Sequence, residues 1–226
     1  MTRRLASPAV STRTKPVAPA PPRLPAELTP GHLLDLDLGT HVQQRSVHGE
    51  VEAVALDDVE VSAGRLLGLR LIGGRITRCA FTDLEIVDSD LSGVDVPDTR
   101  WQRVAVRDSR LAGVSVAGGL WDDVTLDDVR AARLDLRFAT LKRVRFARCD
   151  LSELDLTGAT LDGVVFEDCR LTEARFPELT VKRAEFTDCD LSAALGVGSL
   201  RASSVDAPTL ASLAAPMAAT LGIRLS

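Results

Sequence analysis

The sequence is poor in aromatic residues and lacks two residue types altogether. Aromatic residues make up 4% of the 226 residues, and Tyr and Asn are absent. Because an ordinary globular core relies on large rings, this composition argues against one. No apolar run reaches the ~18 residues that cross a bilayer, and no apolar segment follows Arg3 and Arg4 as it would in a secretory signal. We therefore expect a cytoplasmic protein without a membrane segment.

Charge and residue types also narrow the function. The formal net charge of −5 disfavours direct nucleic-acid binding by the chain as a whole, which requires a basic surface. The three histidines, His32, His41 and His48, lie in one short stretch, and nothing in the pattern places them beside a nucleophile. No Gly-rich phosphate-binding loop is present. We expect no enzymatic activity and no cofactor.

Residues 1–30 differ in composition from the rest of the chain. Seven of the eleven prolines lie here, and five basic residues stand against one acidic residue, Glu27. A segment of this kind buries little surface, so we predict a disordered, Pro-rich basic arm. Two interpretations remain open for it, a solvated tail and an arm that touches an acidic partner.

A five-residue repeat organises the chain after residue 50. From Val51 to Leu191, every fifth residue is a large apolar one except Ala131, over 29 consecutive positions. The position two residues earlier carries no charge and is mostly small. A period of five fits neither a long helix nor a flat strand. Two inward residues in every five predict a short extended piece followed by a turn, which coils the chain so that successive coils stack about 4.8 Å apart.

The repeats resemble those of the pentapeptide repeat family, whose motif is a small residue, Asp or Asn, Leu, and two polar residues. Two copies that match well are Cys149-Asp150-Leu151-Ser152-Glu153 and Cys189-Asp190-Leu191-Ser192-Ala193. Cys169-Arg170-Leu171 departs from the motif at its second position. The resemblance implies an all-β, right-handed quadrilateral β-helix with four repeats per coil, hence about seven coils over residues 51–195.

A 20-residue period is also visible in the inward residues. Phe146, Phe166 and Phe186 recur at this spacing, and so do Cys149, Cys169 and Cys189. Stacked identical side chains pack without voids. We interpret the cysteines as small buried residues and expect no metal site, because a zinc site needs four ligands.

A solenoid needs capped ends. Residues 31–50 are expected to form an irregular N-terminal cap, and residues 196–226 a C-terminal cap with short helices. Asp206 is a plausible N-cap, Gly222 a plausible C-terminal stop, and Pro216 should divide the helical segment in two. The apolar face that should cover the last coil consists of Leu210, Leu213, Met217 and Leu221. The family resemblance adds a possible use of this face in a homodimer.

Outward charges differ between the sides of the predicted coil. One side alternates in sign, with Arg103, Asp123 and Arg143 among its members, and should pair its own charges. Another column, interrupted only by Arg148, consists of Asp88, Asp108, Asp128, Asp168 and Asp188, with Glu167 beside it. Repulsion between such charges is under about 1 kcal/mol in water, and Asp suits turns, so the column could exist without a function. The alternative is a partner-binding acidic face.

These observations leave several hypotheses about function. The first is a non-catalytic interaction rod whose protein partner is unknown. The second follows from the resemblance, because some family members, quinolone-resistance proteins among them, imitate DNA and bind DNA gyrase or another type II topoisomerase. The modest net charge and a basic belt between Arg130 and Arg148 depart from those members. An enzyme, or a nucleic-acid binder that uses the basic arm, is the remaining alternative.

Overall fold

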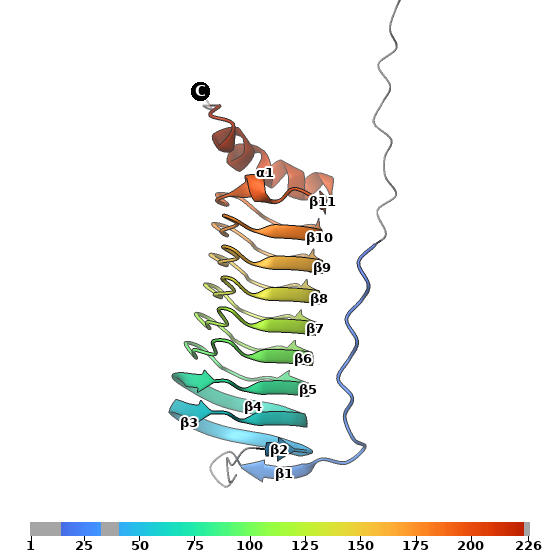
Figure 1. Cartoon of the computed structure of the whole chain (residues 1–226), viewed down its shortest axis with the longest axis vertical. Coiled ribbons are helices and arrows are strands. Elements are labelled where there is room, and N and C mark those ends of the chain that lie inside the picture. Colours follow the sequence, from blue (N-terminus) through green and yellow to red (C-terminus); the bar gives the residue numbers. More distant parts are fainter. Residues whose placement is uncertain (1–14, 33–40, 224–226) are drawn as a thin grey trace, which may run out of the picture.

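The computed structural model describes residues 15–32 and 41–223 and shows a parallel β-solenoid with one C-terminal helix (Figure 1). The solenoid has about eight turns, where the repeat count predicted about seven. Strands of successive coils pair in parallel with a register of 20 residues, as Trp101 does with Trp121 and Phe146 with Phe166. The elements are β1 (Thr29–His32), β2 (His41–Gln43), β3 (Arg45–Asp57), β4 (Glu60–Thr77), β5 (Ala80–Val87), β6 (Arg100–Arg107), β7 (Leu120–Asp127), β8 (Thr140–Ala147), β9 (Thr160–Glu167), β10 (Thr180–Thr187), the 3-10 turn η2 (Val197–Ser199), β11 (Ser203–Val205) and α1 (Ala207–Thr220).

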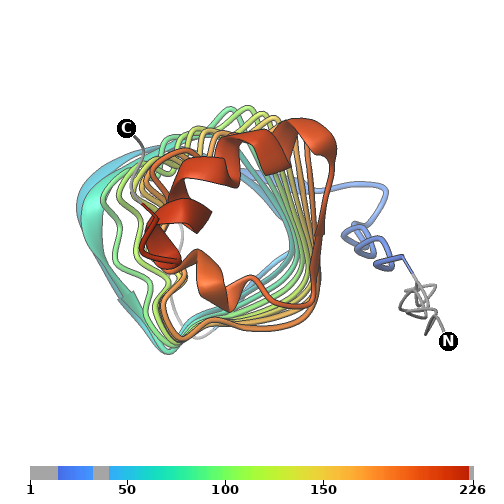
Figure 2. The same ribbon diagram turned by 90° about the horizontal axis from the view of Figure 1, so that it is seen from above.

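The coils superpose as a four-sided tube when they are viewed along the axis (Figure 2). In the regular part, the residues at the corners have positive φ, such as 51° at Arg103 and 49° at Asp108. A non-glycine residue rarely adopts this backbone conformation, and Asp is among the residues that tolerate it best. Corner A is the column Asp83, Arg103, Asp123, Arg143 and Gly163; corner B is Asp88, Asp108, Asp128, Arg148, Asp168 and Asp188; corner C includes Glu153 and Glu173.

The core consists of the residues that the five-residue period predicted. Leu151 and Phe166 are fully buried, and even Ala131, the one small residue in the series, has 0% exposure. The aromatic rings form a stacked column inside the tube, with ring centroids 4.8 Å apart between Phe146 and Phe166. The column continues through Trp121, whose ring lies 6.2 Å from that of Phe146. The predicted fold class and inward residues are therefore confirmed.

The N-terminal segment differs from its prediction. Residues 15–28, predicted to be disordered, lie alongside the stacked coils as an extended arm (Figure 1). The boundary expected at residue 30 falls inside β1, whose residues pair with Arg45–His48 of β3. Part of the cap expected to be irregular is thus regular parallel sheet, and residues 1–14 and 33–40 lie outside the described residues. The prediction of disorder was based on amino-acid composition, which does not reveal the contacts that hold the arm.

The C-terminal cap is one continuous helix and not two. Asp206 is its N-cap, and the Asp206 carboxylate accepts a hydrogen bond from the backbone N–H of Thr209, as predicted. Pro216 lies inside the helix, where it removes one hydrogen bond, but it is buried, and that burial offsets part of the cost. The hydroxyl oxygens of Thr209 and Ser212 accept the backbone N–H groups of Cys189 and Leu191, which end the last regular coil.

Candidate functional site

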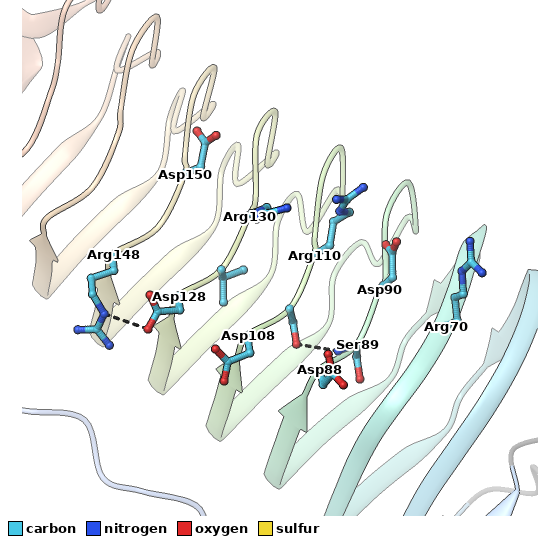
Figure 3. Close-up of a pocket in the computed structure, with 12 residues that line it drawn as sticks. Arg70, Asp88, Ser89, Asp90, Asp108, Arg110, Asp128, Arg130, Arg148 and Asp150 are labelled. Atoms are coloured by element: carbon cyan, nitrogen blue, oxygen red, sulfur yellow. Dashed lines mark hydrogen bonds and ion pairs between the residues drawn. The ribbon is translucent and has the colours of Figure 1, made fainter.

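Corner B carries the acidic column that the sequence singled out. Its aspartates are all exposed. Asp88, Asp108 and Asp128 border a shallow groove of about 830 Å³ (Figure 3), and Asp168 and Asp188 border a second hollow of about 610 Å³. Among the described residues, the carboxylates of four of them make no ion pair: Asp88, Asp108, Asp168 and Asp188. The backbone N–H groups of Asp88, Asp108 and Asp168 donate to carbonyl groups of the next coil, and that of Asp188 donates to the Asp206 carboxylate. These charges therefore have a fixed spacing of about 4.8 Å per coil.

Two members of the predicted acidic face are neutralised. The Arg148 guanidinium donates to Asp128, with 2.9 Å from Nε to Oδ2, and also to Asp127. Arg145 donates to Glu167, with 2.7 Å from Nη2 to Oε2. Arg148 was expected only to interrupt the column. Its side chain, however, is long enough for the guanidinium to reach the carboxylates of Asp127 and Asp128 one coil below. The acidic face therefore consists of two separated pairs of free aspartates.

The side next to corner B mixes charge signs. Its outward column includes Arg110 and Arg130, which are stacked neighbours and both exposed, between Asp90 and Asp150. These side chains line the same groove as the corner aspartates (Figure 3). One edge of the groove thus carries carboxylates and Arg148, and the other edge carries both carboxylates and guanidinium groups, which suits a protein surface of mixed charge better than a uniformly basic one.

Corner A pairs its own charges, as the sequence predicted. Arg103 donates to Asp83 and Arg143 to Asp123, with Nε to Oδ1 distances of 2.6 and 2.7 Å. The hydrogen bonds from these guanidinium groups, together with backbone hydrogen bonds from the arm, hold the pKa values of the two carboxyl groups below their ordinary value of 3.8. The arm's hydrogen bonds come from two backbone N–H groups, that of Ala20 to Asp123 and that of Arg23 to Asp83.

The sequence did not predict that the aspartates of corner A also bind the N-terminal arm. Ala20 donates to Asp123 at 3.0 Å, and Arg23 donates to Asp83 at 2.9 Å, through their backbone nitrogens. The missed signal is the three-residue spacing of Pro16, Pro19, Pro22 and Pro25, which lies within a segment interpreted only by its composition.

The predicted cap face is divided by the structure. Only Leu213 packs on the last coil, with 4% exposure, whereas Leu210, Met217 and Leu221 are exposed. The exposed side chains border an apolar pocket of about 410 Å³ with Val197. The face that covers the coil is formed instead by Thr209, Leu213 and Pro216. The helical face was chosen by apolar character alone, whereas the unpaired N–H groups of the last coil require hydroxyl acceptors.

The cysteines are free and buried. Hydrogen bonding to Cys149, together with burial, raises the pKa of the Cys169 thiol to about 12. A thiol with so high a pKa is a poor nucleophile at neutral pH. Among residues 15–32 and 41–223, no group of three or more His, Cys, Asp or Glu is placed to hold a metal ion. Within the same ranges, no helix has the length and apolar character to cross a membrane.

A family model described as a pentapeptide repeat region matches residues 139–195, which lie in the most regular coils. The five-residue repeats of these coils are pentapeptide repeats. Solved structures similar to this pentapeptide repeat protein include a trypsin-treated form of QnrB1, a plasmid-mediated fluoroquinolone resistance protein, at 16% identity and a TM-score of 0.34, covering 83% of this chain and 100% of that one. HetL, a pentapeptide repeat protein involved in heterocyst differentiation regulation from the cyanobacterium Nostoc sp. strain PCC 7120, has 17% identity and a TM-score of 0.31, covering 75% of this chain and 84% of that one. No curated protein matches the sequence.

Proposed function

We propose that this pentapeptide repeat protein is a non-catalytic interaction rod, and that corner B is its partner-binding surface. The observation that carries this proposal is the set of free aspartates on corner B, Asp88, Asp108, Asp168 and Asp188. Exposed carboxylates without ion pairs are available to a partner, and the fold fixes their positions. The partner that fits is a protein surface with basic groups at matching intervals.

The rigidity of the rod supports this proposal. Backbone hydrogen bonds join each coil to the next at regular lengths, for example 2.8 Å from the Leu111 nitrogen to the Arg130 oxygen and from Leu151 to Arg170. Charges on such a frame lose little conformational freedom when a partner binds, because the backbone is already ordered. Long-range attraction between the acidic column and a basic partner would speed association, and salt would weaken it.

A second candidate is imitation of DNA towards DNA gyrase or another type II topoisomerase. The straight alignment of corner B carboxylates along the axis favours it, since a row of phosphates presents negative charge in a similar way. Asp168 and Asp188 lie nearest α1, so they would be central if two chains joined at that end. The ion pair of Arg148 with Asp128 and the exposed Arg110 and Arg130 limit the length of any such row.

One set of variants tests both candidates. Asp168→Asn and Asp188→Asn remove two charges but keep a residue that tolerates the positive φ of the corner. The matched control is Glu153→Gln with Glu173→Gln, which removes the same charge from corner C, where both residues also have positive φ and are exposed. Proteins that the wild type captures from the native cell extract should not be captured by the aspartate variants or at high salt. The control variant should still capture them.

The result separates the two candidates. If the cognate gyrase is the partner, the wild-type protein should inhibit supercoiling at micromolar concentration and the aspartate variants should not. A protein captured in the corner B-dependent manner, without any effect on gyrase, would support the rod and end the DNA-mimic candidate. Equal capture by wild type, aspartate variants and control would overturn corner B as the binding surface.

We also propose that α1 joins two chains. The exposed Leu210, Met217 and Leu221 and the adjoining apolar pocket leave more apolar surface at the end of the rod than capping requires. Light scattering should give the mass of a dimer at micromolar concentration, and Met217→Glu with Leu221→Glu should give a monomer. A monomeric wild-type chain at that concentration would overturn this proposal.

A further inference from the structure

The arm faces the rod with every third residue. Within residues 15–28, the half-buried positions are Leu24 and a series of spacing three: Pro16, Pro19, Pro22, Pro25 and Leu28. Residues 15–25 have no helix or strand assignment. Proline fixes φ near the polyproline II value, and this left-handed helix has three residues per turn. Figure 2, which looks down the rod, shows the arm as a narrow coiled trace outside the tube. The arm therefore presents one side of a polyproline II helix to the rod.

The pitch of that helix matches the spacing of the coils. Three residues of polyproline II rise about 9.3 Å, and two coils of the solenoid rise about 9.6 Å. The two backbone donors, Ala20 and Arg23, are three residues apart, and their acceptors, Asp123 and Asp83, are two coils apart. One turn of the arm thus advances past two coils, and the same contact is repeated.

Corner A is arranged to receive this repeat. Its carboxylates, Asp83 and Asp123, lie two coils apart, and each is gripped by the arginine one coil above it. Arg103 and Arg143 each donate Nε–H to Oδ1, the oxygen that also accepts the arm's N–H, and Nη2–H to Oδ2. A carboxylate that a guanidinium already orients remains ionised and accepts a further backbone N–H in a fixed direction. The series of side-chain acceptors stops where the corner residue is Gly163, which has no carboxylate.

The sequence of the arm preserves the donors that this arrangement requires. The residue after each inward proline is Val17, Ala20, Arg23 or Ala26, and none of these is proline. Proline does occur at the outward position Pro21, where no donor is used. The arm therefore follows the rule proline, non-proline, any residue, repeated four times. Two of the four N–H groups that this rule keeps, those of Ala20 and Arg23, meet an acceptor on corner A.

We propose that corner A is a recognition site for proline-rich segments in the polyproline II conformation, with residues 15–28 as its resident ligand. The ligand class is a segment with an inward proline every third residue and a backbone N–H directly after it. Recognition uses backbone donors and oriented carboxylates, and the preformed helix lowers the entropy lost on binding. The site lies on a different corner from the acidic face proposed above and does not depend on it.

Docking of the arm is tested by trypsin on the full chain, because Arg23-Leu24 is a cleavable bond within the docked segment. Each cleavage rate is divided by that of a free peptide of residues 14–30 with the same substitution. Ala20→Pro keeps the polyproline II conformation but removes the donor to Asp123, and Ala18→Pro is the matched control at an exposed position without a donor role. We expect protection of Arg23-Leu24 in the wild type and in the control, and about tenfold less protection with Ala20→Pro. Equal rates for wild type and peptide, or equal effects of the two prolines, would overturn the proposal.

Recognition of a separate ligand is tested with a labelled peptide of residues 14–28. The receptor is the full chain with Ala20→Pro and Arg23→Pro, whose own arm competes less, and circular dichroism checks that it is folded. Fluorescence anisotropy should show saturable binding to this receptor and at least tenfold weaker binding to the wild type, whose arm occupies the site. A peptide of the same composition with its prolines at other spacings should not bind. Absence of saturable binding, or equal binding of the two peptides, would overturn the proposal.

Discussion

The chain builds the same charged motif on two neighbouring corners, with different results. On corner A, Arg143 donates to Asp122 and Asp123; on corner B, Arg148 donates to Asp127 and Asp128. In each case the arginine stands one coil above a pair of aspartates, and the corner residues have positive φ. The local chemistry and backbone are therefore matched.

The two motifs differ in what covers them. The side chain of Asp123 is 12% exposed and that of Arg143 26%, against 51% for Asp128 and 47% for Arg148. The Pro-rich arm lies on corner A and donates a backbone N–H to Asp123, and no segment among residues 15–32 and 41–223 donates one to Asp128. A repeated sequence thus gives an occupied surface on one corner and an open one on the next, and the difference comes from a segment outside the repeats.

The largest expected effect is on stability, when Arg143 of the covered corner A and Arg148 of the open corner B are each replaced. Arg143→Met leaves two partly buried carboxylates without their partner, so we expect the free energy of unfolding to fall by about 1–3 kcal/mol. Arg148→Met removes an exposed pair whose attraction is screened by water, so the loss should be clearly smaller. Both substitutions place Met at a corner with positive φ, so the backbone strain cancels in the comparison. Denaturant unfolding followed by circular dichroism measures both, and equal losses would contradict the account.

Acid should release the arm only at low pH. The hydrogen bonds from Arg143 and from Ala20 lower the pKa of Asp123, and Asp83 is affected in the same way by Arg103 and the arm. A lowered pKa in the docked state means that the contribution is complete above the ordinary aspartate value of 3.8 and is lost as the pH falls through the lowered value.

Amide chemical shifts of the arm, followed by NMR while the rod remains folded, measure this release. The shifts of Ala20 should be constant between pH 7 and pH 5 and should change below the ordinary aspartate value. A midpoint between pH 5 and pH 6 would mean that these carboxylates do not hold the arm.

The repeats were predictable from the sequence because each obeys a local rule. Leu151 and Phe166 could be placed in the core because the five-residue period depends only on their own positions. The ion pairs of corner A followed from the 20-residue register. The ion pairs of Arg148 with Asp127 and Asp128 could not be predicted, because the 20-residue register shows which residues are neighbours but not which rotamers their side chains adopt. The continuity of α1 through Pro216 depends on packing against the last coil. The placement of the arm depends on the match between the pitch of a polyproline II helix and the spacing of the coils, which amino-acid composition does not show.

The side chain of Arg23 should contribute least. The docking contact is its backbone N–H, and its exposed guanidinium adds only a screened attraction to the carboxylates. Arg23→Gln should therefore weaken docking by less than about 0.5 kcal/mol, measured from the amide exchange rate of Ala20. A loss as large as that caused by Ala20→Pro would mean that the arm docks through its positive charge instead of its backbone.

Amide hydrogen exchange of the arm in the wild-type chain tests the central claim most directly. The claim is that one turn of the proline-rich arm spans two coils and places an N–H on each corner A aspartate. Ala20 and Arg23 should then exchange roughly ten times more slowly than Ala18 and Ala26, after correction for intrinsic rates, although all four lie in a segment without helix or strand. Equal, unprotected exchange at the four positions would contradict the account.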